Sequence, residues 1–335
     1  MLTEGEPMNH KPAPVGRRAF LAGAAALGLG ACGPGTQGGG GESGATKPVR
    51  HPYGETQVPI SPRRVITLDP GQAMQVAVEH GVPLVASATL ETDQPVPGYL
   101  PPPKQPFEHL GFGQVDVERL AGFGPDLIVG HITILRDKYP AVSGLAATVA
   151  YANTANKVEW HEASLTVADI FGVRQAQQQR LDAYRARAGE FRTRHARLLG
   201  GRKIVLLRFT TEELRIITDS VIFPSRILTD AGVTRSPSSA PGKPTDTYTS
   251  LSPEQVGRLA DADAIIHFSG GGASEGGQVS STFAKYTEGD LWRRLPAVRN
   301  GKVFEVSRIS WWDGGSTSAA NAVLDDLDRT VGKLA

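Results

Sequence analysis

The sequence predicts an α/β protein with two lobes, each built around a central, mostly parallel sheet, joined by one long helix. Three observations support this class. Short β-rich runs alternate with helical patterns, a long helical repeat without proline separates two such regions, and the second region repeats the plan of the first. Roughly 300 residues follow the N-terminal leader, which is enough for two domains.

The chain opens with a segment typical of protein export. Small apolar residues run from 19 to 31 and follow the pair Arg17 and Arg18, as in the basic and apolar parts of a signal peptide. The run is shorter than the roughly 20 residues that span a bilayer. Residues 1–31 are therefore predicted to be a signal peptide, and the arginine pair resembles the twin-arginine export signal.

Cys32 is the only cysteine of the chain. The preceding Leu-Gly-Ala resembles a bacterial lipobox, in which the cysteine is acylated with diacylglycerol and becomes the N-terminus after cleavage. The resemblance implies a protein anchored by lipid to the outer face of the cytoplasmic membrane. The alternatives are a buried core cysteine or an unprocessed helix. One cysteine forms no intramolecular disulfide, so the folded body must be stable through its core.

The composition argues against nucleic acid as a partner and predicts a flexible tether near the N-terminus. The chain has 35 Lys and Arg against 34 Asp and Glu, and it lacks a basic block, so nucleic acid is not an expected partner. Residues 32–48 are rich in glycine and are predicted to be a flexible tether.

The N-terminal α/β lobe is predicted over residues 49–172. A helix over 72–80 follows the turn 69–71, and a short helix capped by Asp116 runs through Leu120. The strands expected here span residues 64–68, 83–87, 126–129 and 147–152.

The linking helix is predicted over residues 173–199. Its apolar positions recur at spacings of three and four, and at 1.5 Å per residue its helical repeat is roughly 40 Å long. We interpret its seven arginines as a solvated face, and a single long helix is expected to restrict hinge motion.

The C-terminal α/β lobe is predicted over residues 200–335. Helices are expected at about 225–231 and 319–331. The strands expected in this lobe span residues 203–209, 214–218, 263–267 and 302–306.

The two lobes share a local motif. In each, a helix-capping residue precedes a glutamate at the second helical position, and an aspartate then leads into a strand. The glutamates are Glu118 and Glu254. The helix dipole favours a glutamate in a first turn, which is enough to explain either one alone. Two at matching places also indicate a pair of exposed charges offered to a partner with two-fold symmetry.

Four segments carry a family resemblance, in order along residues 60–331. They read PRRVITLDPGQAMQVAVEHGVPLVA, HLGFGQVDVERLAGFGPDLIVG, LSPEQVGRLADADAII and LWRRLPAVRNGKVFEVSRISWW, with the long helix between the second and third. The chain resembles bacterial solute-binding proteins of ABC importers for iron-siderophores, haem and vitamin B12. The resemblance implies a monomer that holds its ligand in a cleft between the lobes. It also implies partners, an ABC permease with its ATPase, and that Glu118 and Glu254 dock to arginines of the permease.

Ligands of open α/β sheets bind at the carboxyl ends of strands, so the loops after the strands are the expected site. In the N-terminal lobe the candidates are Gln72, Phe112, Gln114 and His131. The place of Phe112 before the docking glutamate resembles that of an aromatic ligand contact in the family.

The C-terminal lobe supplies five further candidates, Arg208, Tyr248, Arg308, Trp311 and Trp312. Tyr248 holds the place analogous to Phe112. Adjacent tryptophans on a glycine-flanked loop are costly unless they cover something, either a ligand or the closing helix. Arg208 lies in an apolar strand and needs a partner. The resemblance implies the oxygens of an iron chelate, and a structural ion pair is the alternative.

The expected ligand is iron within its own chelator. No closely spaced cluster of His, Asp, Glu or Cys offers a bare metal a complete set of ligands. The candidate loops have more aromatic than cationic residues, which favours a ferric hydroxamate or mixed siderophore over a tris-catecholate of charge near minus three. Arg208, Arg308 and Arg136 converging on the cleft would reverse this preference.

Haem and cobalamin stay open as alternatives, with His131, Tyr248 and His267 as candidate axial ligands. A secreted hydrolase with a dispersed active site is the alternative from a different class. The chain lacks a complete Walker loop, a dinucleotide fingerprint, a G-x-S-x-G elbow and an H-E-x-x-H motif, so no enzyme activity and no bound cofactor are predicted.

Overall fold

The computed structural model describes residues 44–90, 94–113, 115–270 and 279–334. Residues 44–335 form one compact unit. The expected signal peptide, most of the tether, Cys32 and the ligand candidate Gln114 lie outside the described residues. No helix in the described ranges has the length and apolar character needed to cross a membrane.

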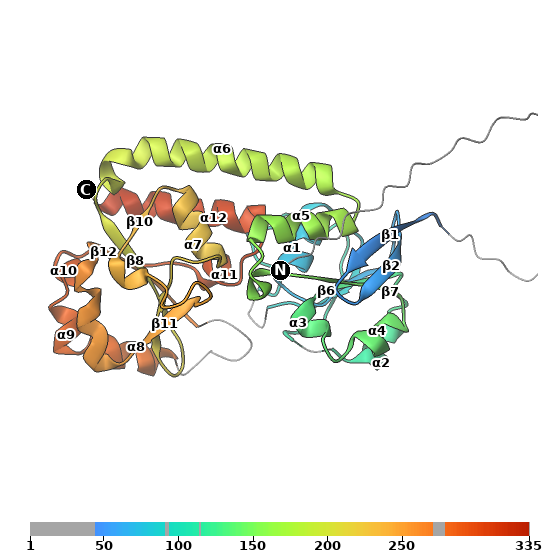
Figure 1. Ribbon diagram of the computed structural model, residues 1–335, viewed down its shortest axis with the longest axis horizontal. Helices are drawn as coiled ribbons and strands as arrows, with labels where there is room; N and C mark the ends of the chain where they lie inside the picture. The colour runs from blue at the N-terminus through green and yellow to red at the C-terminus, as the bar shows by residue number, and fades with distance from the viewer. Residues whose placement is uncertain (1–43, 91–93, 114, 271–278, 335) are drawn as a thin grey trace, which may run out of the picture. The chain divides into compact units, whose positions relative to one another are not determined.

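The N-terminal lobe lies on the right in Figure 1. Its sheet is entirely parallel. Its order is β5 (Glu108–His109), β4 (Leu84–Ser87), β3 (Val65–Thr67), β6 (Leu127–His131) and β7 (Ala147–Tyr151). From β3 the chain adds strands first on one side and then on the other. At such a reversal the loops at the carboxyl ends diverge and leave a crevice.

Helices cover both faces of this sheet. Val65 packs in a core with α1 (Gln72–Glu79) and α5 (Trp160–Ile170), whereas the next residue, Ile66, packs in a second core on the opposite face. The helices on that opposite face are α2 (Val117–Gly122), α3 (Ile132–Leu135) and α4 (Tyr139–Ser143). A strand buried on both faces lacks the apolar–polar alternation of a half-exposed strand, and the adjacent Val65 and Ile66 are both apolar and buried.

A β-hairpin precedes this lobe and was not expected from the sequence. Strands β1 (Thr46–His51) and β2 (Gly54–Pro59) pair antiparallel, so the last three residues assigned to the tether belong to the fold. The Thr56 hydroxyl donates to the carbonyl of Thr148 within β7, 3.1 Å away. The hairpin is mostly polar and half-exposed, so it lacks the apolar alternation that identifies a strand.

The sheet of the C-terminal lobe is mixed. Its order is β11 (Tyr248–Leu251), β9 (Leu214–Ile217), β8 (Lys203–Phe209), β12 (Ala264–Ser269) and β13 (Val303–Glu305), and β10 (Thr234–Arg235) also pairs with β8. Strands β8, β10, β12 and β13 are parallel, and β9 joins β8 and β11 antiparallel. The strands predicted in both lobes are present with small differences at their ends.

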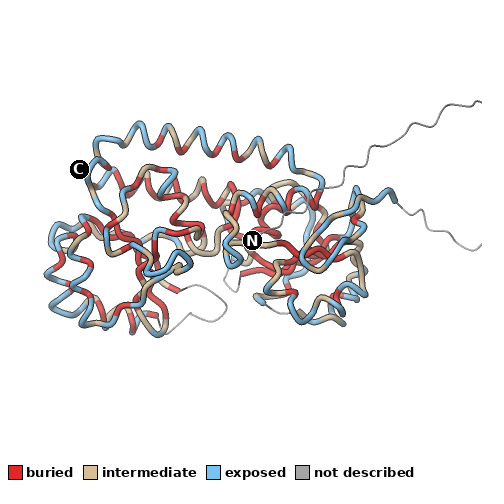
Figure 2. Tube along the Cα trace, in the orientation of Figure 1, coloured by how far each residue is buried: buried red, intermediate tan, exposed pale blue. Residues whose placement is uncertain are grey.

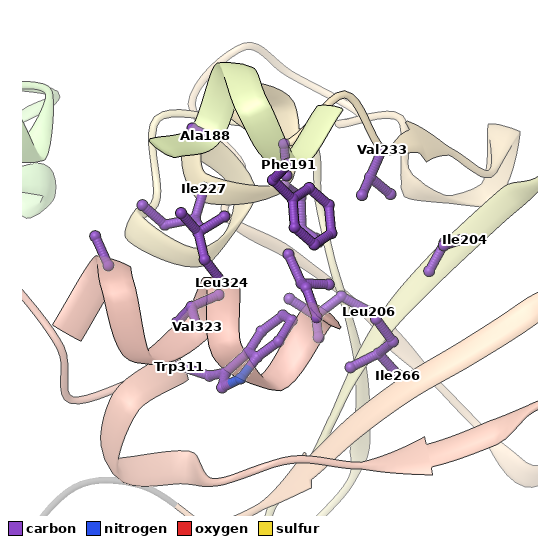
Figure 3. Close-up of a cluster of buried hydrophobic side chains, with 14 of the residues drawn as sticks. Ala188, Phe191, Ile204, Leu206, Ile227, Val233, Ile266, Trp311, Val323 and Leu324 are labelled. Carbon is purple, nitrogen blue, oxygen red and sulfur yellow. The ribbon is translucent and has the colours of Figure 1, made fainter. Parts of the chain in front are cut away.

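Helices also cover both faces of the second sheet. One core contains Leu206 and Ile266 with α7 (Phe223–Asp230), α11 (Arg308–Trp311) and α12 (Thr317–Val331), as Figure 3 shows. On the opposite face are Val205 and Ile265. The elements on that face are α8 (Val279–Thr287), α9 (Asp290–Arg293), α10 (Pro296–Arg299) and the 3-10 segment η3 (Pro253–Asp261). The remaining short 3-10 turns are η1 (Thr154–Asn156), η2 (Pro237–Ser239) and η4 (Gly332–Leu334).

The linking helix α6 spans Arg174–Leu199, as its apolar spacing predicts. Its trace alternates between buried and exposed segments (Figure 2). Its arginines are at least partly solvated, as interpreted, but three of them, which recur every seven residues, also pair with carboxylates of neighbouring helices. Arg180 pairs with Glu79 at 3.0 Å, Arg187 with Asp325, and Arg194 with Asp328 at 3.1 Å. The helix is thus bonded both to α1 and to α12.

Candidate ligand-binding site

A pocket of about 220 Å³ lies between the two lobes. Its N-terminal wall comes from loops after the carboxyl ends of β3, β4, β5, β6 and β7, together with the first residue of α5. Its C-terminal wall comes from the first residue of α7 and from residues 312–315. The pocket therefore lies where the reversal in strand order predicts a ligand site.

Four of the ligand candidates line this pocket: Gln72, Phe112, His131 and Trp312. They come from positions far apart in the chain and from both lobes. Four others, Arg208, Tyr248, Arg308 and Trp311, do not line it. The structure thus brings together the N-terminal candidates that it describes, and only one of the C-terminal candidates.

Gln72 helps to form the junction between the lobes. Its side-chain amide donates to the carbonyl of Trp160, 2.7 Å away. Gly315 of the other lobe packs against it so closely that a Cβ there would lie 2.8 Å from the Gln72 Cγ. Only glycine therefore fits at residue 315, and the backbone there can form part of the pocket wall.

Trp160 begins α5 and lines the pocket, although it was not expected there from the sequence. Its ring contacts Phe223 of the C-terminal lobe edge-to-face, with centroids 5.3 Å apart. Its indole Nε1 is buried and has no hydrogen-bond partner among the described residues. A tryptophan in the first turn of an amphipathic helix is an ordinary core residue, so nothing in the local sequence indicates that Trp160 lies beside the pocket.

Asp69 is a buried carboxylate in the pocket wall, within the turn that follows β3. The Tyr151 hydroxyl donates to it at 2.8 Å and the Ala73 amide at 3.2 Å. Burial raises the pKa of Asp69, and the nearby His131 and the Tyr151 hydrogen bond act in the opposite direction. Burial, followed by the charge of Asp69, raises the pKa of Tyr151.

His131 ends β6 and caps helix α3. Its Nδ1 accepts a hydrogen bond from the Ile134 amide, 3.2 Å away, so the neutral ring carries its proton on Nε2. Its ring meets Tyr151 edge-on, with centroids 6.4 Å apart. His131 is therefore held in place by local structure and presents its other ring nitrogen for an additional contact.

The two adjacent tryptophans have different environments. Trp311 is 0% exposed, and its indole donates to Asp326 on α12 at 2.8 Å. Figure 3 shows it in the core beside Val323 and Leu324. Trp312 is partly exposed and lines the pocket. The expectation of a ligand contact is thus corrected for Trp311, which packs against the closing helix.

Arg208 and Arg308 lie beside the pocket wall rather than in it. Arg208 is 5% exposed, donates from Nε to the carbonyl of Gly270 at 2.8 Å, and places its guanidinium 4.2 Å from the ring centre of Trp312. Arg308 pairs with Asp313 at 3.4 Å. Both arginines therefore support pocket-lining residues, in the first case through a cation–π contact.

Tyr248 and His267 also lie away from this pocket. Tyr248 is 40% exposed on β11, with the guanidinium of Arg215 4.2 Å from its ring centre. His267 is buried between Phe209 and Phe283, and burial lowers its pKa to about 4. Of the candidate axial ligands, only His131 lines the pocket.

The ionisable side chains in the described pocket wall are Asp69, Asp313 and His131, and this wall contains no lysine or arginine. Arg136 at the end of α3 is exposed and does not line the pocket, so the three arginines do not converge there. The segments 91–93, 114 and 271–278 contain no lysine or arginine in their sequence. Among the described residues, no group of three or more His, Cys, Asp or Glu is placed to hold a metal ion.

The repeated motif of the two lobes has a structural counterpart. Asp126 accepts from the Arg63 amide at 2.7 Å, and Asp263 accepts from the Lys203 amide at 2.7 Å. Each aspartate thus ties the start of one central strand to its neighbour, β6 to β3 and β12 to β8. The two lobes therefore correspond in structure as well as in sequence at this motif.

The two glutamates of this motif are exposed at the second position of their helical turns. Asp116 caps the helix of Glu118 by accepting from the Arg119 amide at 3.1 Å. Ser252 caps the 3-10 turn of Glu254 in a capping box with Gln255. The hydrogen bond with Ser252 lowers the pKa of Glu254. Each glutamate is thus an exposed acidic group on a short, capped turn.

Two α/β lobes joined by a long helix, with a pocket between them at the ends of the sheets, define a solute-binding protein. Residues 65–308 match the periplasmic binding protein family, and because the match covers more than half of the chain, the protein belongs to that family. It is a binding protein of a transport system and not an enzyme.

Two relatives and one solved structure are similar to this chain. The putative ABC transporter substrate-binding lipoprotein YhfQ of Bacillus subtilis is 27% identical over 293 residues, covering 84% of this chain and 88% of the relative. The achromobactin-binding periplasmic protein of Dickeya dadantii is 25% identical over 276 residues, covering 81% and 87%. Staphylococcus aureus SirA complexed with staphyloferrin B has a TM-score of 0.70 at 23% identity, covering 86% of this chain and 98% of SirA.

Proposed function

We propose that this protein is the extracytoplasmic, lipid-anchored binding component of an ABC importer and that it captures a ferric siderophore. The single observation that carries the proposal is the pocket between the lobes, lined by aromatic and polar residues from both, in a chain of this family. The names of two relatives support it, since one is a probable siderophore-binding lipoprotein and another binds achromobactin.

The charge of the pocket favours a neutral or cationic chelate. Asp69 and Asp313 line the described wall, and Arg308 behind the wall pairs with Asp313. The wall itself has no lysine or arginine to bind an anionic ligand. A ferric tris-catecholate has a charge near minus three and would be repelled, whereas a ferric hydroxamate is nearly neutral or weakly positive. Phe112 and Trp312 offer apolar surface to the hydrocarbon parts of such a chelate. A hydroxamate or mixed siderophore is therefore the ligand class we propose.

Haem is the second candidate ligand, and it rests on His131. This histidine is the one candidate axial ligand in the described pocket wall. An axial bond from Nε2 would require the ring to release the Ile134 amide and to carry its proton on Nδ1 instead. No equivalent feature of the described pocket favours cobalamin.

Anchoring and delivery complete the proposal. The lipobox at Cys32 would hold the protein at the outer face of the cytoplasmic membrane, and two relatives are named as lipoproteins. Acting as a monomer, the protein would dock to the permease through Glu118 and Glu254, which are exposed on corresponding turns of the two lobes. The ATPase would act on the far side of the membrane.

The test is a titration of tryptophan fluorescence in the mature chain carrying Cys32→Ser. The probes are a ferric trihydroxamate, a ferric tris-catecholate, haemin and cobalamin, each compared with its iron-free or metal-free form where one exists. We expect saturable quenching by the ferric trihydroxamate, absent with the free chelator and reduced in Trp312→Phe. A haemin response lost in His131→Ala would establish haem instead. No response to any probe would refute the proposal.

A further inference from the structure

One face of α1 contacts the other lobe directly. Gln72, Gln75 and Glu79 are spaced by three and four residues, so they lie on one side of this helix. Such polar side chains are unusual on the buried side of a helix unless each has a defined partner. Gln75 and Glu79 find those partners in residues 313–318 of the C-terminal lobe.

Glu79 binds the N-terminus of α12. Its side chain is 0% exposed, and Oε1 accepts from the Ser318 amide at 2.7 Å and from the Thr317 hydroxyl at 2.8 Å. Arg180 of α6 donates to the same oxygen at 3.0 Å. A carboxylate of the N-terminal lobe is thus placed at the positive end of a 15-residue helix of the C-terminal lobe.

Arg180 extends this contact to the linking helix. Besides Glu79, it donates to the Thr317 hydroxyl at 3.0 Å and to the Ser318 hydroxyl at 2.9 Å. Three elements, α1, α6 and α12, therefore meet at one buried carboxylate. Removing that carboxylate would leave several donors without their acceptor, which is costly where water does not reach them.

Gln75 holds the segment just before α12. Its amide nitrogen donates to the carbonyl of Asp313 at 2.9 Å, and its amide oxygen accepts from the Gly315 amide at 3.3 Å. Residues 313–315 line the ligand pocket and directly follow Trp312. Gln75 therefore binds the pocket wall from behind by two backbone hydrogen bonds.

We propose that Glu79 and Gln75 are positioning residues that latch the 312–315 wall onto the N-terminal lobe and so set ligand affinity without lining the pocket. This inference rests on the proposed function, because it takes the pocket as the ligand site. A wall held in its binding arrangement before the ligand arrives loses little conformational freedom on binding. Without the latch, only part of the population has the competent wall, and the apparent affinity falls by that fraction.

The test compares Glu79→Ala, Glu79→Gln and Gln75→Met in the mature chain. The control is Asp325→Asn, which breaks the Arg187–Asp325 pair between α6 and α12 but leaves the N-terminal lobe untouched. Kd and the dissociation rate are measured with a ferric trihydroxamate, and urea unfolding shows that each variant is folded. X-ray scattering gives the radius of gyration with and without the chelate.

We expect Glu79→Ala and Gln75→Met to raise Kd about tenfold, mainly through faster dissociation. Glu79→Gln should recover most of the affinity because its amide oxygen still accepts from Thr317 and Ser318. Asp325→Asn should bind like the wild type. Folded Glu79→Ala and Gln75→Met variants with unchanged Kd would overturn the latch, as would an equal loss in Asp325→Asn.

A wild-type protein that binds no ferric chelate would refute the proposed function and leave the latch to be judged by scattering. In that case an unliganded Glu79→Ala protein with a larger radius of gyration than the wild type would support the latch. An identical radius would count against it.

Discussion

At the scale of single residues, the adjacent Trp311 and Trp312 have different structural roles. Trp311 ends α11 and enters the core, where Asp326 accepts its indole proton. Trp312 follows the helix, lines the pocket and stacks with Arg208. Both residues are equally apolar and equally placed after the last strand. Only the direction of the short helix decides which side chain lines the pocket.

The same substitution at these two positions is expected to have opposite effects. Trp311→Phe should lower the free energy of unfolding by about 2–3 kcal/mol, because it removes buried volume and leaves Asp326 without its indole donor. Ligand affinity should be unchanged. Trp312→Phe should weaken binding by about threefold to tenfold, with an unfolding change below about 1 kcal/mol. Urea unfolding and ligand titration of both variants check this, and a greater loss of binding in folded Trp311→Phe would contradict it.

At the scale of elements, regular apolar spacing predicted helices and strands, whereas polar elements without such spacing were not predicted. The apolar repeat of α6 predicts its bounds, and the apolar runs of β3, β6, β8 and β12 identify central strands. The β1–β2 hairpin is polar and half-exposed, so its sequence resembles the tether before it. The pairing of Arg180, Arg187 and Arg194 depends on which face of α6 the neighbouring helices cover. This depends on tertiary packing, so an arginine-rich sequence does not indicate which of its arginines are paired.

The apolar stripe of α6 is expected to hold this helix more strongly than its arginines do. Phe191→Ala should cost about 3–5 kcal/mol of unfolding free energy, since Phe191 is buried in the core. A double-mutant cycle on Arg187 and Asp325, which are 40% and 54% exposed, should give a coupling below about 1 kcal/mol that decreases in high salt. Urea unfolding supplies both values. A coupling comparable to the cost of Phe191→Ala would show that the ion pairs dominate.

At the scale of the whole molecule, the two lobes match in more than their order of elements. An aspartate links corresponding central strands in each lobe, and an exposed glutamate lies on the capped turn before it. The pocket between the lobes uses residues of both, whereas the two glutamates do not line it. This separation allows ligand capture and docking to be tested independently.

The double variant Glu118→Gln and Glu254→Gln is expected to bind the ferric chelate like the wild type and to abolish its uptake by cells. The reason is that both side chains are exposed, lie outside the pocket and lose only their charge. Uptake of radioactive iron as the chelate, with titration of the purified protein, measures the two effects. Glu108→Gln with Glu305→Gln, an exposed pair also drawn from both lobes, is the control and should transport normally. Loss of chelate binding in the docking variant would refute the assignment.

The sequence by itself determined the family, the order of the main elements, the long linking helix and the matched glutamates. These features depend on short-range spacing and on ordered segments that can be read along one chain. The tertiary structure alone decided which candidates form the pocket, because Gln72, Phe112 and Trp312 are distant in sequence and meet only where strand ends converge. It also decided the charge of the pocket, since Arg208 and Arg308 turned out to lie beside its wall while Asp69 lines it.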